Sequence, residues 1–234
     1  FAFIVETLAT HSKNKVALTE LLTDEETRDK ILDHELLFQK IQQKLGFSKI
    51  SPYLYFYILT RRVFLETNLD DRNVADYVAC MLAEFCSLRR SMSISHYHAK
   101  KYQYLTDLIL DFMDASSHEA FLIRSHMGNY ALFLTGIFPD YVFRKSTYGR
   151  KSPGFDYYEK MGSSSYHWAS QHKMAVKYSL AEILASLAEY FRHVRLALNK
   201  LADQYMVIDE RPENMDKMLR QIFYGEMGNQ SFDA

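Results

Sequence analysis

The chain has 234 residues, which suits one large domain or two small ones and allows a sizeable core without disulfide or metal staples. Hydrophobic residues make up 48% and charged residues 24%, so the composition is that of a globular protein and excludes disorder as the main theme. The formal net charge of −1 argues against a general nucleic-acid binder but leaves room for a local basic patch. Because no apolar run approaches the ~20 residues of a membrane span, no membrane contact is expected.

Turn-forming residues are sparse, with 8 glycines and 4 prolines, and no segment shows strand-like alternation bounded by tight-turn signals. The sequence therefore predicts an all-α fold, a single irregular bundle of about eight helices over residues 1–234, with essentially no β-sheet. The expected helices lie at about residues 15–22, 24–45, 51–67, 71–92, 99–113, 116–138, 155–160, 175–206 and 212–224.

Several helix ends carry recognisable signals. Thr23 is placed to cap the second helix, Pro52 lies in the first turn of the third, and Pro139 ends the sixth. The fourth helix has the clearest apolar face, formed by Val74, Val78, Met81, Leu82, Phe85, Leu88 and Met92. The last long helix has a similar stripe, formed by Leu180, Ile183, Leu184, Leu187, Phe191, Val194, Leu198, Leu201 and Tyr205.

The two cysteines, Cys80 and Cys86, fall in one predicted helix, where they point to different faces and are not placed to form a disulfide. No pair of cysteines has the spacing of a zinc site. We therefore expect buried, reduced thiols, a cytoplasmic location and no cofactor.

Three segments, Met127–Pro139, Phe155–Tyr166 and Leu180–Leu201, occur in an order that resembles an uncharacterised bacterial protein family of unknown function. The resemblance covers about a third of the chain, and it implies a helical architecture without implying an activity. The family pattern has an acidic residue after the glycine of the first segment, where this chain has Asn129.

The helix that runs from about Ser117 to Phe138 is apolar nearly all round, yet it contains Arg124, His126 and Asn129. A buried charge is costly unless it is paired, so Arg124 should find a carboxylate or several carbonyl groups. One interpretation is a packed interface, in which Tyr hydroxyls or carboxylates satisfy these side chains. In that case the small residues on the face of Ser125, Asn129, Leu132 and Gly136 let a neighbouring helix approach. The other is a ligand pocket that includes Tyr157 and Tyr158.

Two pairs of residues have spacings that invite comparison with metal sites. Glu189 and His193 are four residues apart, but on a helix they lie about 140° from the apolar stripe, which predicts a solvated face. His96 and His98 are expected at the start of a helix, where they diverge by about 200°. The sequence therefore predicts no bound metal.

A predicted loop holds four cations, Arg144, Lys145, Arg150 and Lys151, flanked by Phe143 and Tyr148. Arginine forks suit phosphate or carboxylate groups, so this loop is a candidate anion-binding site, although its residue order is not that of a phosphate-binding P-loop. The alternative is an ordinary solvated basic loop.

No sequence motif of a nucleophile, a zinc protease or a dinucleotide site occurs. The leading hypothesis is a non-catalytic helical module that binds a partner protein or a regulatory ligand. The alternative is an enzyme or small-molecule binder with an internal polar pocket around Arg124, His126 and Tyr157. A nucleic-acid role through the basic loop ranks third, and a homo-oligomer stays open.

Overall fold

The computed structural model describes residues 23–43, 50–86, 93–95, 98–101, 117–148 and 152–206. The contacts between residues divide the chain into two compact units, residues 1–80 and 81–234, and α6 crosses this boundary. Each unit is described by itself. The single domain expected from the sequence stays a prediction.

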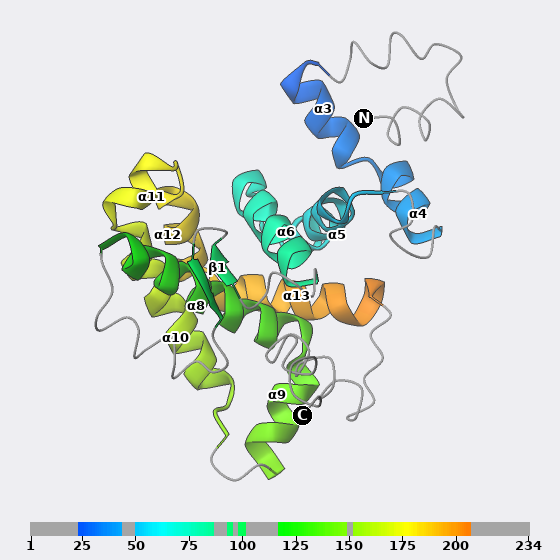
Figure 1. The fold of residues 1–234 in the computed structure, drawn as a ribbon. Helices are drawn as coiled ribbons and strands as arrows, with labels where there is room; N and C mark the ends of the chain where they lie inside the picture. Colours follow the sequence, from blue (N-terminus) through cyan, green and yellow to red (C-terminus); the bar gives the residue numbers. More distant parts are fainter. Residues whose placement is uncertain are drawn as a thin grey trace, which may run out of the picture. The chain divides into compact units, whose positions relative to one another are not determined.

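The all-α fold class is confirmed (Figure 1). The described residues form ten helices, rather than about eight, and one hairpin of two short strands. These elements are α3 (Glu25–Leu32), α4 (Glu35–Gln43), α5 (Pro52–Glu66), α6 (Arg72–Cys86), β1 (Ser93–Ser95), β2 (His98–Lys101), α8 (Ser117–Ile137), α9 (Pro139–Tyr148), α10 (Phe155–Ser170), α11 (Lys173–Lys177), α12 (Ala181–Glu189) and α13 (Phe191–Tyr205). The helices expected at residues 15–22 and 212–224 lie outside the described residues.

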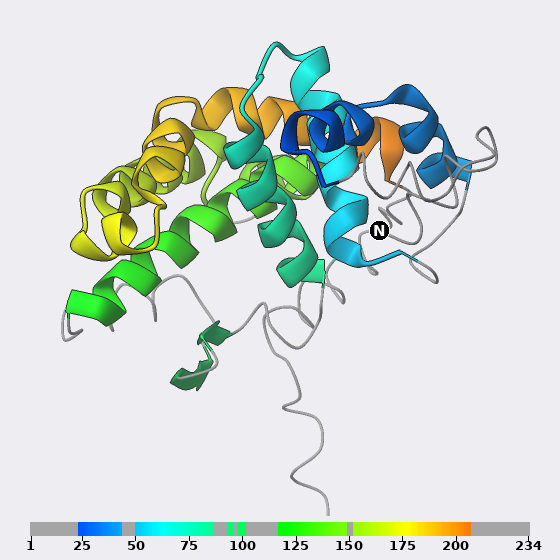
Figure 2. The same cartoon turned by 90° about the horizontal axis from the view of Figure 1, so that it is seen from above.

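The hairpin corrects the prediction of a helix from residue 99 with His98 at its start. Strands β1 and β2 pair antiparallel, with Ser93 opposite Lys101 and Ser95 opposite His98, so His98 belongs to a strand. The segment Ser-Ile-Ser that forms β1 alternates polar and apolar residues, a period-two pattern that is short enough to be overlooked. The hairpin is drawn in dark green in Figure 2.

In the first unit, the helix expected over residues 24–45 is divided into α3 and α4. Asp24, and not Thr23, caps α3, because its carboxylate accepts a hydrogen bond from the Thr27 amide at 2.8 Å. The chain leaves the helix at Asp33, and His34 Nδ1 accepts from the Leu36 amide at 3.2 Å, which starts α4. A side-chain cap inside an apparently continuous helical pattern therefore produces two helices.

Helices α5 and α6 follow the predicted pattern closely. Ser51 caps α5 by accepting from the Leu54 amide at 3.2 Å, and Pro52 occupies the first turn. The apolar stripe of α6 is confirmed where it is described, with Val74, Val78, Met81, Leu82 and Phe85 all buried. Cys80 is exposed, so the expectation of a buried thiol was wrong there, because Cys80 lies on the face opposite the stripe.

In the second unit, α8 lies beside α10 and α13, as Figures 1 and 2 both show. Twelve of its 21 residues are buried, in agreement with its nearly continuous apolar sequence. The close approach expected at Gly136 is confirmed, because a Cβ atom added there would lie 2.9 Å from the Leu198 side chain of α13. Gly162 of α10 is still more confined, since its added Cβ would lie 2.4 Å from the Phe191 ring and 3.0 Å from Ala131.

Three boundaries in this unit differ from the prediction. The stretch after Pro139, expected to be irregular, forms α9, and the short helix expected at residues 155–160 extends to Ser170 as α10. The long helix expected over residues 175–206 is divided into α11, α12 and α13, with Ser179 in the left-handed region (φ 56°) and a bend at Tyr190. The apolar stripe nevertheless stays largely buried, because Leu184, Leu187, Phe191, Val194, Leu198 and Leu201 keep to one side across that bend.

None of the described helices combines the length and the apolar character that crossing a membrane requires.

We expect Gly162→Ala to lower the free energy of unfolding by about 1–3 kcal/mol, because the added methyl group overlaps the buried Phe191 ring. Urea denaturation followed by circular dichroism measures the change. Gly154→Ala is the matched control, since its nearest atom would be Ser146 Cβ at 3.6 Å, an ordinary contact. Equal effects of the two substitutions would contradict the packing argument.

Candidate functional site

Arg124, the charged residue that sequence analysis placed in the middle of an apolar helix, packs against the tryptophan of α10. Its guanidinium carbon lies 5.8 Å from the centroid of the Trp168 ring, a cation–π arrangement. The side chain is half-buried rather than buried as expected, and burial lowers the pKa of Arg124 from its ordinary value. Trp168 in turn stacks on His172 at 5.3 Å, and His172 stacks on Phe121 at 5.5 Å.

His126 points away from Arg124, toward the last turn of α6. Its ring stacks on Phe85 with centroids 5.8 Å apart and an interplanar angle of 13°. Burial lowers the pKa of His126 to about 4, because the charged imidazolium would lose its hydration there. His126 is therefore neutral at physiological pH and packs as an aromatic ring.

Asn129 is satisfied in the way that the packing interpretation expects. The hydroxyl of Tyr166, a residue that is 0% exposed, donates to Asn129 Oδ1 at 2.8 Å. This bond gives the buried phenol of α10 the partner that such a group requires. Asn129 thus joins α8 to α10.

Tyr157 and Tyr158 lie at the start of α10, where their rings meet edge to face at 5.5 Å. Tyr157 is 45% exposed, whereas burial raises the pKa of Tyr158 to about 12 with a further contribution from nearby Tyr141. Burial also raises the pKa of Tyr130, with smaller contributions from Tyr158 and Tyr141. Tyrosines of α8, α9 and α10 therefore gather in one place, a cluster to which the sequence pointed only through its high tyrosine content.

The structure thus brings Arg124 and Asn129 to α10, but His126 to α6. Each of the three polar side chains of α8 has its own aromatic neighbour, and their contacts are those of a packed interface. A pocket that uses all of these residues stays a prediction.

The basic segment is helical where it is described, which corrects the expected loop. Arg144 and Lys145 lie in the second half of α9, and Arg150 and Lys151 lie outside the described residues. Arg144 is half-buried and Lys145 exposed, with Lys145 Nζ 5.5 Å from the centroid of the Tyr141 ring. Because Tyr141, Arg144, Lys145 and Tyr148 follow the spacing i, i+3, i+4, i+7, they share one face of the helix. We call these four residues the α9 stripe.

The described residues that were considered for metal binding do not form a metal-binding cluster. Glu189 and His193 are both exposed, which confirms the predicted solvated face, and Tyr190 packs on His193 with centroids 6.1 Å apart. His96 lies outside the described residues, and His98 is in β2. Within the described ranges, no group of three or more His, Cys, Asp or Glu side chains is arranged to hold a metal ion.

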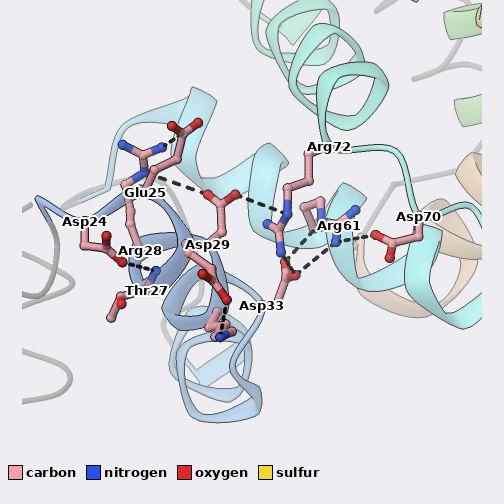
Figure 3. Close-up of polar contacts among 11 residues, drawn as sticks. Asp24, Glu25, Thr27, Arg28, Asp29, Asp33, Arg61, Asp70 and Arg72 are labelled. Carbon is pink, nitrogen blue, oxygen red and sulfur yellow. Dashed lines mark hydrogen bonds and ion pairs between the residues drawn. The ribbon is translucent and has the colours of Figure 1, made fainter.

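Sequence analysis missed an arginine network in the first unit (Figure 3). Arg61, only 1% exposed, donates to both oxygens of Asp33, from Nε at 3.1 Å and from Nη2 at 2.9 Å, and Nη2 also reaches Asp70 at 3.0 Å. Arg72 pairs with the same Asp33 carboxylate and lies 3.3 Å from Asp29. The signal in the sequence was an Arg-Arg pair within the apolar segment Pro52–Glu66.

The electrostatics of this network follow from its burial. Burial alone would lower the pKa of Arg61, but its hydrogen bonds with Asp33 and Asp70 raise it overall. Burial raises the pKa of Tyr57, against the opposing effect of a hydrogen bond with Arg72. The guanidinium group of Arg61 therefore stays charged, and Asp33 is an acceptor that Arg61 and Arg72 share.

A second buried arginine ties together the helices of the second unit. Arg195 Nε donates to Glu159 at 2.7 Å, and its Nη1 donates to Asn199 Oδ1 at 2.9 Å. Asn199 Nδ2 then donates to the carbonyl oxygens of Thr135 and Gly136, both at 2.8 Å. The last carbonyl groups of a helix have no partner within it, so Asn199 of α13 satisfies the C-terminal end of α8.

Comparison with known proteins gives no relative: no protein-family model, no curated protein sequence and no solved structure matches this chain.

The stability of the protein should depend on pH through His126. The pKa of His126 is about 4 in the folded chain and about 6.5 in the unfolded one, so the unfolded chain binds the proton more readily. The contribution of His126 to stability is therefore complete above pH 6.5 and is lost as pH falls toward 4, by up to about 1.4 kcal/mol per pH unit. Urea denaturation at several pH values measures this slope, and His126→Asn should flatten it. An equal slope in both proteins would contradict the prediction.

Replacing Asn199 should destabilise the protein through α8. Asn199→Ala leaves two helix-end carbonyl groups and one donor of Arg195 without this partner, at a cost of about 1–3 kcal/mol in the free energy of unfolding. Asn73→Ala is the matched control, because Asn73 is exposed on α6 and surface substitutions usually change stability by about 0.5 kcal/mol or less. Chemical denaturation of both variants tests the difference.

Proposed function

We propose that this chain is a non-catalytic helical module that binds a partner protein, and that the exposed part of α9 contacts that partner. The observation that carries the proposal is the exposure of two aromatic rings on one ten-residue helix. Tyr148 is 82% exposed and Phe143 is 56% exposed. Aromatic residues and arginine are enriched at protein interfaces, where they supply most of the contact energy.

The α9 stripe indicates the character of the partner. Tyr141 and Tyr148 flank Arg144 and Lys145 along it, so apolar surface and positive charge occur together. An acidic, partly apolar segment would complement both properties, and charge complementarity would raise its association rate and its selectivity. A nucleic acid could use the same groups, but the net charge of −1 of the whole chain favours a protein partner.

The alternative, an enzyme or small-molecule binder with a pocket around Arg124, His126 and Tyr157, receives less support. Arg124 and His126 pack against different helices, and Tyr157 lies exposed at the start of α10.

Peptide selection tests the proposed function. A random peptide library displayed on phage is selected against the full chain, and the enriched peptides are synthesised and measured by fluorescence anisotropy. We expect enrichment of Asp, Glu and aromatic residues, and an affinity that falls as salt rises because exposed charges are screened over about 8 Å at physiological ionic strength. Lys145→Glu combined with Tyr148→Ser should weaken binding by about tenfold or more, since interface aromatics commonly contribute over about 1 kcal/mol each.

A matched control is available on α11, where Lys177 Nζ lies 5.5 Å from the ring centroid of the exposed Tyr178. Lys177→Glu combined with Tyr178→Ser removes the same groups from a different surface and should leave peptide affinity unchanged. Peptides that bind both variants as well as the original protein would show that α9 is not the contact surface. A selection that yields no binder would count against the module itself.

A further inference from the structure

The arginine network of the first unit holds helix α3 through ion pairs (Figure 3). None of the residues of α3 is buried, and its apolar residues Ile31 and Leu32 are half-buried. Two carboxylates, Asp29 and the C-cap residue Asp33, meet the guanidinium groups of Arg61 and Arg72. Helix α4 is different, because Leu37, Phe38 and Ile41 anchor it in the core.

The two carboxylates have the spacing of one helical turn. Asp29 and Asp33 are four residues apart, so both point from one side of α3 toward the arginines, as Figure 3 shows. Asp33 accepts from Arg61 and Arg72 at once, the arrangement in which arginine pairs recognise carboxylate or phosphate ligands. The two arginines therefore bind a helix that carries two carboxylates one turn apart. In this structure, that helix is α3.

Donors remain unused in the same place. The Nη1 atoms of Arg61 and Arg72 are buried and have no hydrogen-bond acceptor among the described residues. Arg61 itself is 1% exposed. A buried guanidinium nitrogen without an acceptor costs free energy, so a ligand that brings an acceptor within reach of either Nη1 atom would gain stability from it.

The net charge around Arg61 and Arg72 determines whether a ligand could bind beside α3 or must replace it. Asp29, Asp33 and Asp70 already balance Arg61, Arg72 and the Arg28 that pairs with Asp29, so an added anion would meet a site with no excess positive charge. A ligand must therefore replace α3, and an acidic helix that brings two carboxylates of its own leaves the local charge unchanged. Helix α3 has no fully buried residue and is followed by the core-anchored α4, so it can leave the site while the chain stays attached.

We propose that Arg61 and Arg72 form a docking site for an acidic helix of a partner protein, with two carboxylates four residues apart, and that α3 occupies this site as an intramolecular competitor. The proposal is independent of the contact surface on α9. Because α3 is part of the same chain, its effective concentration at the site is on the order of millimolar. A partner helix must therefore bind the arginines tightly enough to displace α3 at that effective concentration.

The test uses α3 itself as the ligand. A fluorescent peptide of residues 23–36 is closed by a lactam between Glu26 and Lys30, which already pair at 2.7 Å, so that the short helix stays folded in isolation. Its binding is measured by anisotropy to the full chain and to the double variant Asp29→Asn, Asp33→Asn. We expect the double variant to bind the peptide about tenfold or more tightly than the original protein, because the competitor is weakened.

The controls distinguish a site from which a ligand displaces α3 from a set of ion pairs that only stabilises the fold. Asp24→Asn with Glu26→Gln removes the same charge from α3 without touching the arginines and should leave peptide binding at the original level. A peptide with both Asp29 and Asp33 changed to Asn should not bind, and Arg72→Ala in the double variant should abolish binding. Equal affinity in all proteins would overturn the proposal. So would a double variant that loses helical circular dichroism well beyond the eight residues of α3, because the carboxylates would then be holding the fold together.

Discussion

A helix that is apolar nearly all round must be covered on every side, and α8 imposes this constraint on the second unit. Helices α10 and α13 can cover it only by approaching closely, which Gly162 and Gly136 permit. Close approach then places Tyr166 beside Asn129 and Asn199 beside the last carbonyl groups of α8, so the polar groups that burial would strand find partners. Asn129 and the last carbonyl groups of α8 thus have their partners on the helices that cover it.

A buried guanidinium group needs carboxylate or carbonyl acceptors, and the two buried arginines, Arg195 and Arg61, obtain them in different ways. Arg195 is held by Glu159 and Asn199 between helices that also share a large apolar core, so its contacts join elements that already pack together. Arg61 instead meets Asp33 at the end of a helix that buries none of its residues. The same chemistry therefore joins two well-buried helices in one unit and a core helix to a more exposed one in the other, and the proposed exchange concerns only the second case.

The sequence predicted α5, α6 and α8 well. The buried face of α6 repeats at the helical period, α8 is apolar nearly all round, and Ser51 with Pro52 marks the start of α5. Apolar periodicity could not reveal the break at Asp33, because a histidine cap such as His34 leaves no mark in the apolar pattern. The partners of Asp33, Arg61 and Arg72, are 28 and 39 residues away in the chain, so a local pattern could not reveal them either. It also missed the bend at Tyr190, because the buried stripe continues from Leu187 to Phe191 without losing its side. The partners of Asn129 and His126 depended on which helices meet α8, which no local pattern specifies.

The contact between Gly162 and Phe191 has a consequence for how this sequence can vary. The two positions share one volume, so their sizes are coupled: a larger residue at 162 requires a smaller one at 191, and Ala131 limits escape on the other side. Single changes at either position are then disfavoured, whereas paired changes that conserve the total volume are tolerated. Relatives of this chain should therefore show correlated substitution at these positions, which would locate α10 against α13 from sequence alone.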